Sequence, residues 1–323
     1  MADVQQVVDR ILAGDVRAAA RLMRDLDDGV PGAREVLKGL YPNSGRAHLI
    51  GVTGSPGVGK STLTDRLIQR LRADGRTVGV VAVDPTSPFS GGAILGDRIR
   101  MQRHATDPGV FIRSLATRGH FGGLTASTRA VLTVLDAMGK DVLLAETVGV
   151  GQDEVEIAAT ADTTIVVTVP GLGDDIQALK AGLLEVADLL VVNKADREGA
   201  DRTRQDLLMM LDMRRGRDPE SWQPRVYLTQ AKDDVGVAEL LEGVREHREF
   251  LHRDQGRALA AARRGHVRQE FLELLKEGVF RRLVRRLDQD GRLEAAVEAI
   301  LARRTDPYSA CEEMIRTCLD RSE

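Results

Sequence analysis

Cysteine and net charge are scarce in this sequence, and each scarcity excludes a class of protein. The cysteines, Cys311 and Cys318, lie near the end of the chain, where their number and spacing give neither a disulfide framework nor a metal-ligand pattern. The 46 Lys and Arg residues nearly balance 49 Asp and Glu residues. The net charge of −3 therefore gives no electrostatic support for nucleic acid or an anionic membrane as a partner.

Long apolar runs are also missing. No segment approaches the roughly 18 apolar residues that a membrane span needs. The N-terminus carries Asp3 and Asp9 and has no apolar core of the kind found in secretory signals. Together with the low cysteine content, these features predict a protein of the reducing cytoplasm, without nucleic acid or a membrane as a partner.

Against this background the sequence has one strong motif, a phosphate-binding loop of the form G-x-x-x-x-G-K-[ST]. An apolar segment, 47–53, precedes the motif, and leucines at helical spacing follow it. In such loops glycines let backbone N–H groups converge on a polyphosphate at the start of a helix. The residues predicted to bind the nucleotide here are Gly54, Ser55, Pro56, Gly57, Val58, Gly59, Lys60, Ser61 and Thr62.

Two residues of the loop have separate expected roles. Lys60 would reach the β- and γ-phosphates, and the Ser61 hydroxyl would ligate Mg²⁺. Strand and helix flank the motif in the correct order, which argues against a chance match in a glycine-rich turn.

Apolar segments alternate with amphipathic ones from about 45 to 235, which predicts an α/β fold: a P-loop NTPase three-layer α/β/α domain with a mostly parallel sheet. A helical N-terminal extension, 1–44, would precede this domain, and a helical C-terminal arm, 236–323, would follow it. The arginine-rich stretch of the arm has no interleaved aromatic residues and is expected to be a solvated helix face. The predicted strands are 47–53, 77–83, 110–113, 141–146, 163–169, 189–193 and 225–229.

The base of the nucleotide is predicted from Asn193-Lys194-Ala195-Asp196, which reads as the guanine-specifying N-K-x-D element. The Asp196 carboxylate can accept from both N1–H and the exocyclic amine of guanine, whereas adenine offers no such pair of donors. GTP is therefore preferred over ATP. After the next strand, Ala231 is placed to contact the guanine O6 through its backbone N–H, although Gln230 departs from the small residue usual before it.

Three carboxylates are placed to manage the metal ion. Asp84 and Glu146 end predicted strands, and Asp97 follows a glycine-rich loop. Mg²⁺ bridging the phosphates prefers hard oxygen ligands. Asp84 and Asp97 could equally be turn residues or helix caps, whereas Glu146 ends so apolar a strand that it needs a partner. Gly149, just beyond it, could let a backbone N–H approach the γ-phosphate.

Taken together, these motifs resemble the methylmalonyl-CoA mutase-associated GTPases of the MeaB/ArgK type. The resemblance covers nearly the whole chain and includes the helical extensions at both ends. The segments that carry it are 53–62, 84–97, 146–152, 170–175, 193–196 and 306–308.

The resemblance implies a slow GTPase that acts as a chaperone for an adenosylcobalamin-dependent acyl-CoA mutase, gating cofactor delivery and protecting the mutase from inactivation. It implies GTP or GDP and Mg²⁺ as ligands, and a homodimer held largely through the C-terminal arm. By position, Lys60 and Glu146 would be catalytic, Glu146 by helping to position the attacking water. The loop 171–180, with Asp174, Gln177 and Lys180, resembles a switch that communicates with the partner.

Two other functions share parts of this pattern. One is a P-loop kinase or ATPase associated with basic amino-acid transport, for which the sequence offers no second acceptor-binding feature. The other is metal delivery, which generally needs Cys or His clusters, whereas the histidines here, including His104 and His120, are scattered. Arg118 stays open between a phosphate-sensing arginine finger, a partner contact and a plain surface residue.

Overall fold

A computed structural model describes residues 4–84, 101–116, 126–147, 157, 160–171, 184–213 and 221–319 of the 323-residue chain. The chain divides into two compact units, Met1–Arg263 and Arg264–Glu323. The first unit contains a parallel sheet, and the described part of the second is helical.

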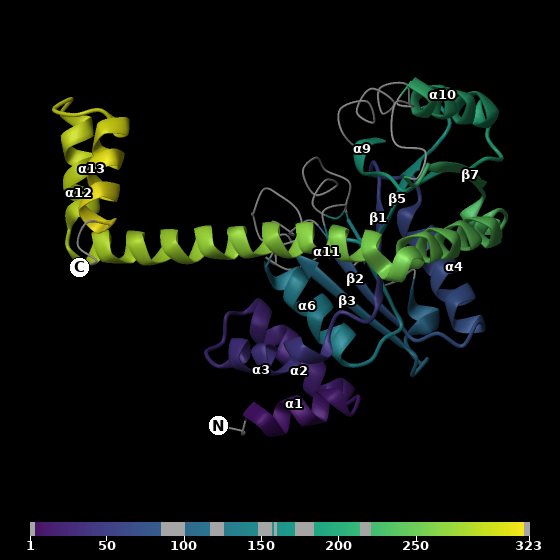
Figure 1. The fold of residues 1–323 in the computed structure, drawn as a ribbon, viewed down its shortest axis with the longest axis horizontal. Helices are drawn as coiled ribbons and strands as arrows, with labels where there is room; N and C mark the ends of the chain where they lie inside the picture. Colours follow the sequence, from purple (N-terminus) through teal and green to yellow (C-terminus); the bar gives the residue numbers. More distant parts are fainter. Residues whose placement is uncertain are drawn as a thin grey trace. The chain divides into compact units, whose positions relative to one another are not determined.

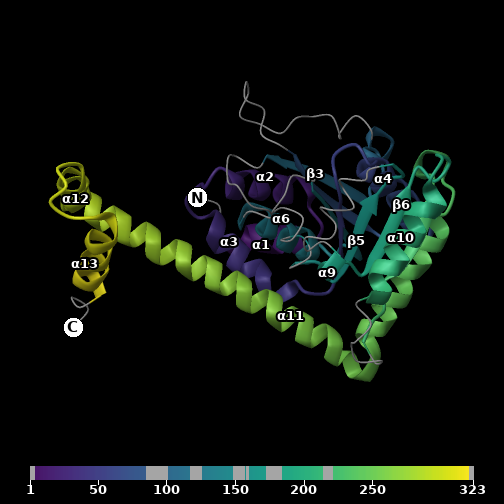
Figure 2. The same cartoon turned by 90° about the horizontal axis from the view of Figure 1, so that it is seen from above.

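The sheet of the first unit has seven parallel strands in the order β3-β2-β4-β1-β5-β6-β7, labelled in part in Figure 1 and Figure 2. Each predicted strand is confirmed, and β3 runs three residues beyond its predicted end. The strands are β1 (His48–Thr53), β2 (Val78–Asp84), β3 (Val110–Ala116), β4 (Val142–Glu146), β5 (Thr163–Thr168), β6 (Leu189–Asn193) and β7 (Arg225–Thr229).

Helices cover both faces of the sheet, which explains why β4, β5 and β6 are buried along their whole length and read as continuous apolar runs. On one face, α4 (Lys60–Ala73) and the first turns of α11 (Val237–Gln289) share an apolar core with β1 and β4. On the other face lie α6 (Ala126–Ala137) and α10 (Ala200–Met213). The predicted three-layer α/β/α fold is confirmed.

The N-terminal helices pack on α6 and belong to the same core as the sheet. They are α1 (Val4–Leu12), α2 (Val16–Asp27) and α3 (Ala33–Leu40), followed by the short η1 (Tyr41–Asn43). Asp15 caps α2 by accepting from the backbone N–H groups of Arg17 and Ala18 at 2.9 and 3.0 Å. Ile11 and Met23 are fully buried in this core. The division of the chain at 44 and 235 stays a prediction.

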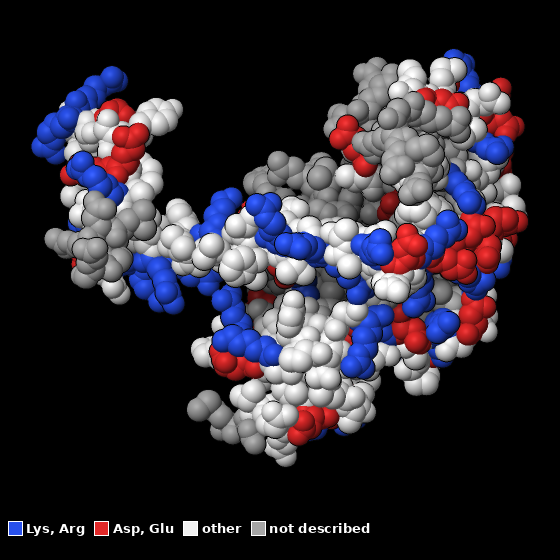
Figure 3. Space-filling view, viewed as in Figure 1, with Lys and Arg blue, Asp and Glu red and all other residues white. Residues whose placement is uncertain are grey.

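Short helices complete the description of the first unit. They are η2 (Gln102–His104), α9 (Leu184–Val186) and η4 (Ala231–Asp233). In the view of Figure 3, Lys and Arg are the main charged side chains along the long horizontal part of α11. Among the described residues, we find no helix that combines the length and apolar character needed to cross a membrane.

The helix α11 begins in the first unit and ends in the second, and its backbone leaves helical conformation at Arg253–Gly256. In the second unit, α12 (Arg292–Leu301) and α13 (Pro307–Leu319) follow α11. Asp306 separates α12 from α13 and caps α13 by accepting from the N–H groups of Tyr308 and Ser309 at 2.9 and 3.0 Å.

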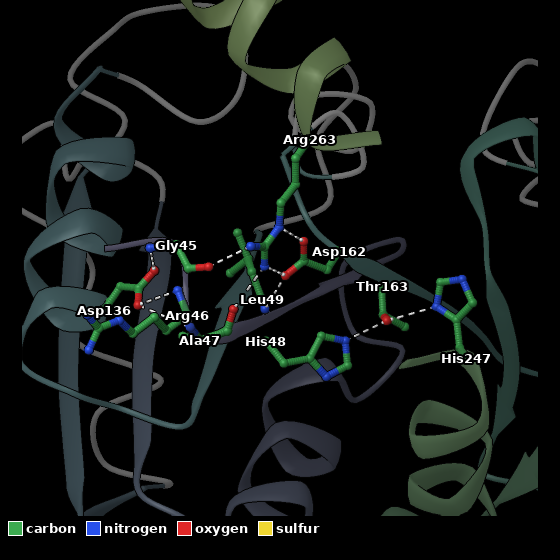
Figure 4. A network of polar contacts seen from close by, with 10 residues as sticks. All are labelled: Gly45, Arg46, Ala47, His48, Leu49, Asp136, Asp162, Thr163, His247 and Arg263. Atoms are coloured by element: carbon green, nitrogen blue, oxygen red, sulfur yellow. Dashed lines mark hydrogen bonds and ion pairs between the residues drawn. The ribbon is translucent and has the colours of Figure 1, made fainter. Parts of the chain in front are cut away.

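A polar network joins α11 to the N-terminal edge of the sheet (Figure 4). Arg263 donates to both carboxylate oxygens of Asp162 at 3.0 Å and to backbone carbonyls just before β1. Thr163 at the start of β5 lies 2.8 Å from a ring nitrogen of His48 and 2.8 Å from one of His247 on α11. These contacts therefore lie at the N-terminal edge of the sheet. Parallel α/β sheets bind their ligands at the opposite edge, which the carboxyl ends of the strands form.

Candidate functional site

The phosphate-loop motif, 54–61, starts directly after β1 and ends in the first two residues of α4, at the carboxyl edge of the sheet. Gly54 has φ 137°, and a Cβ there would lie 2.1 Å from the carbonyl oxygen of Val167. Gly59 has φ 97°, and a Cβ would lie 2.5 Å from the Asn193 amide nitrogen. Only glycine fits either position, since each combines positive φ with the close approach of another chain segment.

Lys60 is the first residue of α4, and its side chain folds back over the loop. Its ammonium group donates to the carbonyl oxygens of Gly54 at 2.6 Å and Ser55 at 3.0 Å. The residue is only 6% exposed. A buried positive charge is thereby fixed above the loop whose backbone N–H groups and helix N-terminus favour anions.

Ser61 and Glu146 connect the phosphate loop to the end of β4. The Ser61 hydroxyl donates to Glu146 Oε1 at 2.6 Å, and both residues are buried. Val52 of β1 pairs in register with Glu146 of β4, which explains why the carboxylate lies beside the loop. A hydroxyl and a carboxylate this close form a pair of hard oxygen donors of the type that Mg²⁺ prefers.

The structure describes no side chain for the remaining predicted metal and switch residues. The backbone of Asp84 ends β2, but its side chain is not described. Among the described residues no group of three or more His, Cys, Asp or Glu could hold a metal ion. The candidate residues from the sequence that lie outside the described ranges are Asp97, Arg118, Gly149, Asp174, Gln177 and Lys180.

Asn193 ends β6 and joins three parts of the site. Its amide nitrogen donates to the carbonyl oxygen of Val58 in the phosphate loop at 2.8 Å. Its amide oxygen accepts from the Thr229 hydroxyl and from the Ala231 N–H, both at 3.1 Å. The structure therefore brings the phosphate loop, the N-K-x-D segment and the loop after β7 together.

Lys194 and Asp196 follow Asn193 in a tight turn. Lys194 has φ 55°, and its ammonium group donates to the Gly57 carbonyl oxygen at 2.7 Å, which lays the side chain alongside the phosphate loop. The Ala195 N–H donates to the Thr229 carbonyl oxygen at 3.0 Å. Asp196 is exposed to solvent. Its carboxylate is therefore open to a base at the edge of the site.

The loop after β7 has a geometry that the sequence did not indicate. Ala231 is buried, and its N–H, expected at the guanine O6, donates to Asn193 in this structure, so a base contact would share that donor. Gln230 forms a bridge with Val235 that closes the loop. On the opposite side, Arg66 and Arg70 of α4 contact the loop. The only sequence feature that could have indicated these contacts is the i,i+4 spacing of the two arginines, which places them on one face of the helix.

The family of this chain follows from comparison with known proteins. A family model described as the methylmalonyl Co-A mutase-associated GTPase MeaB matches residues 20–288. The chain belongs to the MeaB family. The resemblance stated from the sequence motifs is thus confirmed, and the chain is a GTPase of this family.

Individual relatives match most of the chain. A putative GTPase of Pyrococcus abyssi is 48% identical over 314 residues, which is 97% of this chain and 96% of the relative. The GTPase ArgK of Escherichia coli is 35% identical over 279 residues, 83% of this chain and 81% of ArgK. The crystal structure of a LAO/AO transport system kinase superposes with a TM-score of 0.73 at 25% identity, covering 98% of this chain and 97% of the other.

Proposed function

We propose that this MeaB-family GTPase is a nucleotide-controlled chaperone for a cobalamin-dependent acyl-CoA mutase of the methylmalonyl-CoA mutase type. The nucleotide part of the proposal rests on Asn193, whose amide group contacts the phosphate loop and the loop after β7 at the same time. The partner part rests on the family description, which names association with that mutase.

Guanine is the base that the site fits best. The exposed Asp196 carboxylate would accept from N1–H and the exocyclic amine, a donor pair that adenine does not have. Lys194, fixed by its contact with Gly57, would place its aliphatic stem against the base plane. GTP and GDP are therefore the proposed ligands.

Lys60 would stabilise the β- and γ-phosphates. The carbonyl oxygens of Gly54 and Ser55 now accept from its ammonium group, and phosphate oxygens carry more negative charge than these carbonyls. The loop N–H groups and the start of α4 add further donors at the same place. The resulting stabilisation of developing negative charge is the main catalytic effect available to a phosphoryl-transfer site.

Mg²⁺ is proposed to bind beside Ser61 and Glu146, with Asp84 and Asp97 as further candidates. The Ser61 hydroxyl donates to Glu146 Oε1 at 2.6 Å, which places a hydroxyl oxygen beside a carboxylate, and both are hard oxygen ligands of the kind that Mg²⁺ prefers. Bound there, Mg²⁺ would neutralise charge that develops on the phosphate oxygens.

In the proposed reaction, water attacks the γ-phosphorus in line with the bond to the β,γ-bridging oxygen. The new P–O bond forms to the water oxygen, the bridging bond breaks, GDP leaves with the bridging oxygen, and the water proton passes to the phosphate product. Glu146, buried at the end of β4, would orient that water through a hydrogen bond. The segment 171–180 is proposed to transmit the nucleotide state to the mutase.

The test combines the purified protein with a candidate adenosylcobalamin-dependent mutase. We expect mutase to accelerate GTP hydrolysis, and GTP to change the rate of cofactor loading into the mutase, measured by the absorbance of the cobalamin. A Lys60→Ala chain in the same mixture is the control and should show neither effect. Unchanged hydrolysis and unchanged loading with the wild-type chain would contradict the chaperone proposal.

A kinase function is the second candidate, because a solved structure titled as a transport system kinase matches nearly the whole chain. The same mixtures run with γ-labelled GTP separate the two. Label released only as inorganic phosphate supports the chaperone. Stoichiometric label on a protein acceptor would support the kinase instead.

A further inference from the structure

The helix α4 connects the two ends of the candidate site. It begins at Lys60 in the phosphate loop, and two of its arginines reach the loop after β7, defined here as the base loop, residues 230–236. Arg66 donates through Nε to the Ala231 carbonyl oxygen at 3.0 Å and through Nη2 to the Lys232 carbonyl oxygen at 2.6 Å. Its Nη1 donates to Gln69 Oε1 at 3.1 Å, which fixes the guanidinium plane.

Arg70, one turn further along α4, holds the other end of the base loop. It forms a two-point ion pair with Asp234, with Nε and Nη2 at 3.0 and 2.8 Å from the two carboxylate oxygens. Nη2 also lies 3.3 Å from the Asp234 backbone oxygen. Such parallel contacts fix orientation as well as distance. Each side chain of this pair is only 31% exposed.

The base loop itself is a compact turn. The Gln230 N–H donates to the Val235 carbonyl oxygen at 2.9 Å, and the Val235 N–H donates back at 3.3 Å. Asp234 has φ 59°, and Gly236 has φ 72°, with space for no Cβ because the Leu228 carbonyl oxygen would lie 2.0 Å away. A loop with this backbone depends on its outer contacts to hold one conformation.

The base loop is therefore held from two sides. Asn193 accepts the Ala231 N–H on the side of the nucleotide, and Arg66 donates to the Ala231 carbonyl oxygen on the side of α4. Because α4 is a rigid helix that starts in the phosphate loop, these contacts fix the distance between the phosphate end and the base end of the site.

We propose that Arg66 and Arg70 are positioning residues that determine guanine-nucleotide affinity and selectivity by pre-ordering the base loop. This inference rests on the proposed guanine site. A loop already ordered before binding loses less conformational entropy when the base arrives, so affinity for the whole nucleotide is higher. The phosphate contacts are made elsewhere and gain nothing from the two arginines.

The test measures dissociation constants calorimetrically for GDP, ADP and tripolyphosphate. In an Arg66→Gln, Arg70→Gln double variant we expect GDP to bind about tenfold more weakly, while ADP and tripolyphosphate change by less than about twofold. The Arg66→Lys variant should bind GDP little better than an Arg66→Gln variant. A single ammonium group cannot donate to two carbonyl oxygens in the fixed geometry of a guanidinium fork. Asp196→Asn, which removes a direct base contact, is the comparison for lost selectivity.

The matched control is Arg72→Gln. Arg72 also lies on α4 in a part-buried ion pair, with Asp107 at 2.9 Å, but it does not contact the base loop in the described structure. The Arg72→Gln variant should leave the ratio of GDP affinity to ADP affinity unchanged. Unchanged GDP affinity in the double variant would overturn the inference, and so would an equal loss of GDP and tripolyphosphate affinity. A wild-type chain that binds ADP as well as GDP would instead contradict the proposed guanine site.

Discussion

At the scale of single residues, Lys60 gives the most direct test of the site. Its ammonium group has two carbonyl acceptors within the loop, and replacing it with Ala removes the charge proposed for the phosphates without adding bulk. Losing about 3 to 4 kcal/mol of transition-state stabilisation corresponds to a hydrolysis rate lower by about 10²- to 10³-fold. Single-turnover release of phosphate from GTP measures this loss.

The control for that variant is Lys38→Ala, which removes an exposed lysine of α3 that pairs with Glu35. Exposed pairs of this kind contribute little, so its rate should stay within twofold of wild type. Hydrolysis by the Lys60 variant at the rate of the control would show that the phosphate site has been assigned to the wrong residue.

Residues that belong to a short sequence motif could be predicted from the sequence. Residues whose role depends on contacts between distant segments could not. The phosphate loop and the N-K-x-D segment were predicted because each is a short motif that can be recognised in the sequence. The contacts of Arg66 and Arg70 with the base loop depend on how α4 packs against a segment more than 160 residues away. No local pattern encodes that packing. The use of the Ala231 N–H by Asn193 was missed for the same reason.

At the scale of elements, continuous apolar runs predicted the strands because helices bury both faces of the sheet. The end of β3 was placed too early, since its last residues include the polar Ser114, which pairs in register with Ala82 of β2. The break in α11 at Arg253–Gly256 was not predicted. A single glycine in a charged helical segment is a weak signal for a change of backbone conformation.

The junction between α11 and the sheet predicts a dependence of stability on pH. Burial lowers the pKa of His48 from 6.5 to about 3. Between these values the unfolded chain binds a proton that the folded chain does not, so the free energy of unfolding decreases as the pH falls, by about 1.4 kcal/mol per pH unit. From pH 6.5 to pH 5, His48 therefore lowers the free energy of unfolding by about 2 kcal/mol. Urea unfolding at the two pH values measures this decrease.

His247 and Asp188, which lie 3.5 Å apart, also contribute to this pH dependence. Burial lowers the pKa of His247 to about 4, which adds to the loss in acid, and raises the pKa of Asp188 to about 7, which opposes it. The variant His48→Gln isolates one contribution, because its amide can still reach Thr163. We expect the variant to lose about 2 kcal/mol less than wild type over this range. Equal acid losses in wild type and variant would contradict the prediction, and His252→Gln, at an exposed position on α11, is the control.

At the scale of the whole molecule, the second unit exposes many large apolar side chains, and a contiguous group of such side chains marks an interaction surface. Most of its large apolar side chains on α11 are about half exposed or more, and those on α12 and α13 are also open to solvent. The exposed residues are Val267, Phe271, Leu272, Leu274, Leu275, Val279, Phe280, Val297, Leu301, Tyr308 and Ile315. We propose that a second copy of the chain covers this surface, as the family resemblance implies.

The last prediction follows from this surface. Leu275→Glu together with Phe280→Glu places charges on the apolar part of α11, where burial in a dimer would leave them without partners at a cost of several kcal/mol. Sedimentation equilibrium should show a dimer for the wild-type chain and a monomer for the double variant, with basal GTP hydrolysis retained in both. Arg281→Ala, which removes an exposed ion pair with Glu277 on the same helix, should remain dimeric. A wild-type chain that sediments as a monomer at micromolar concentration would exclude the dimer, and a dimeric double variant would place its interface away from this part of α11.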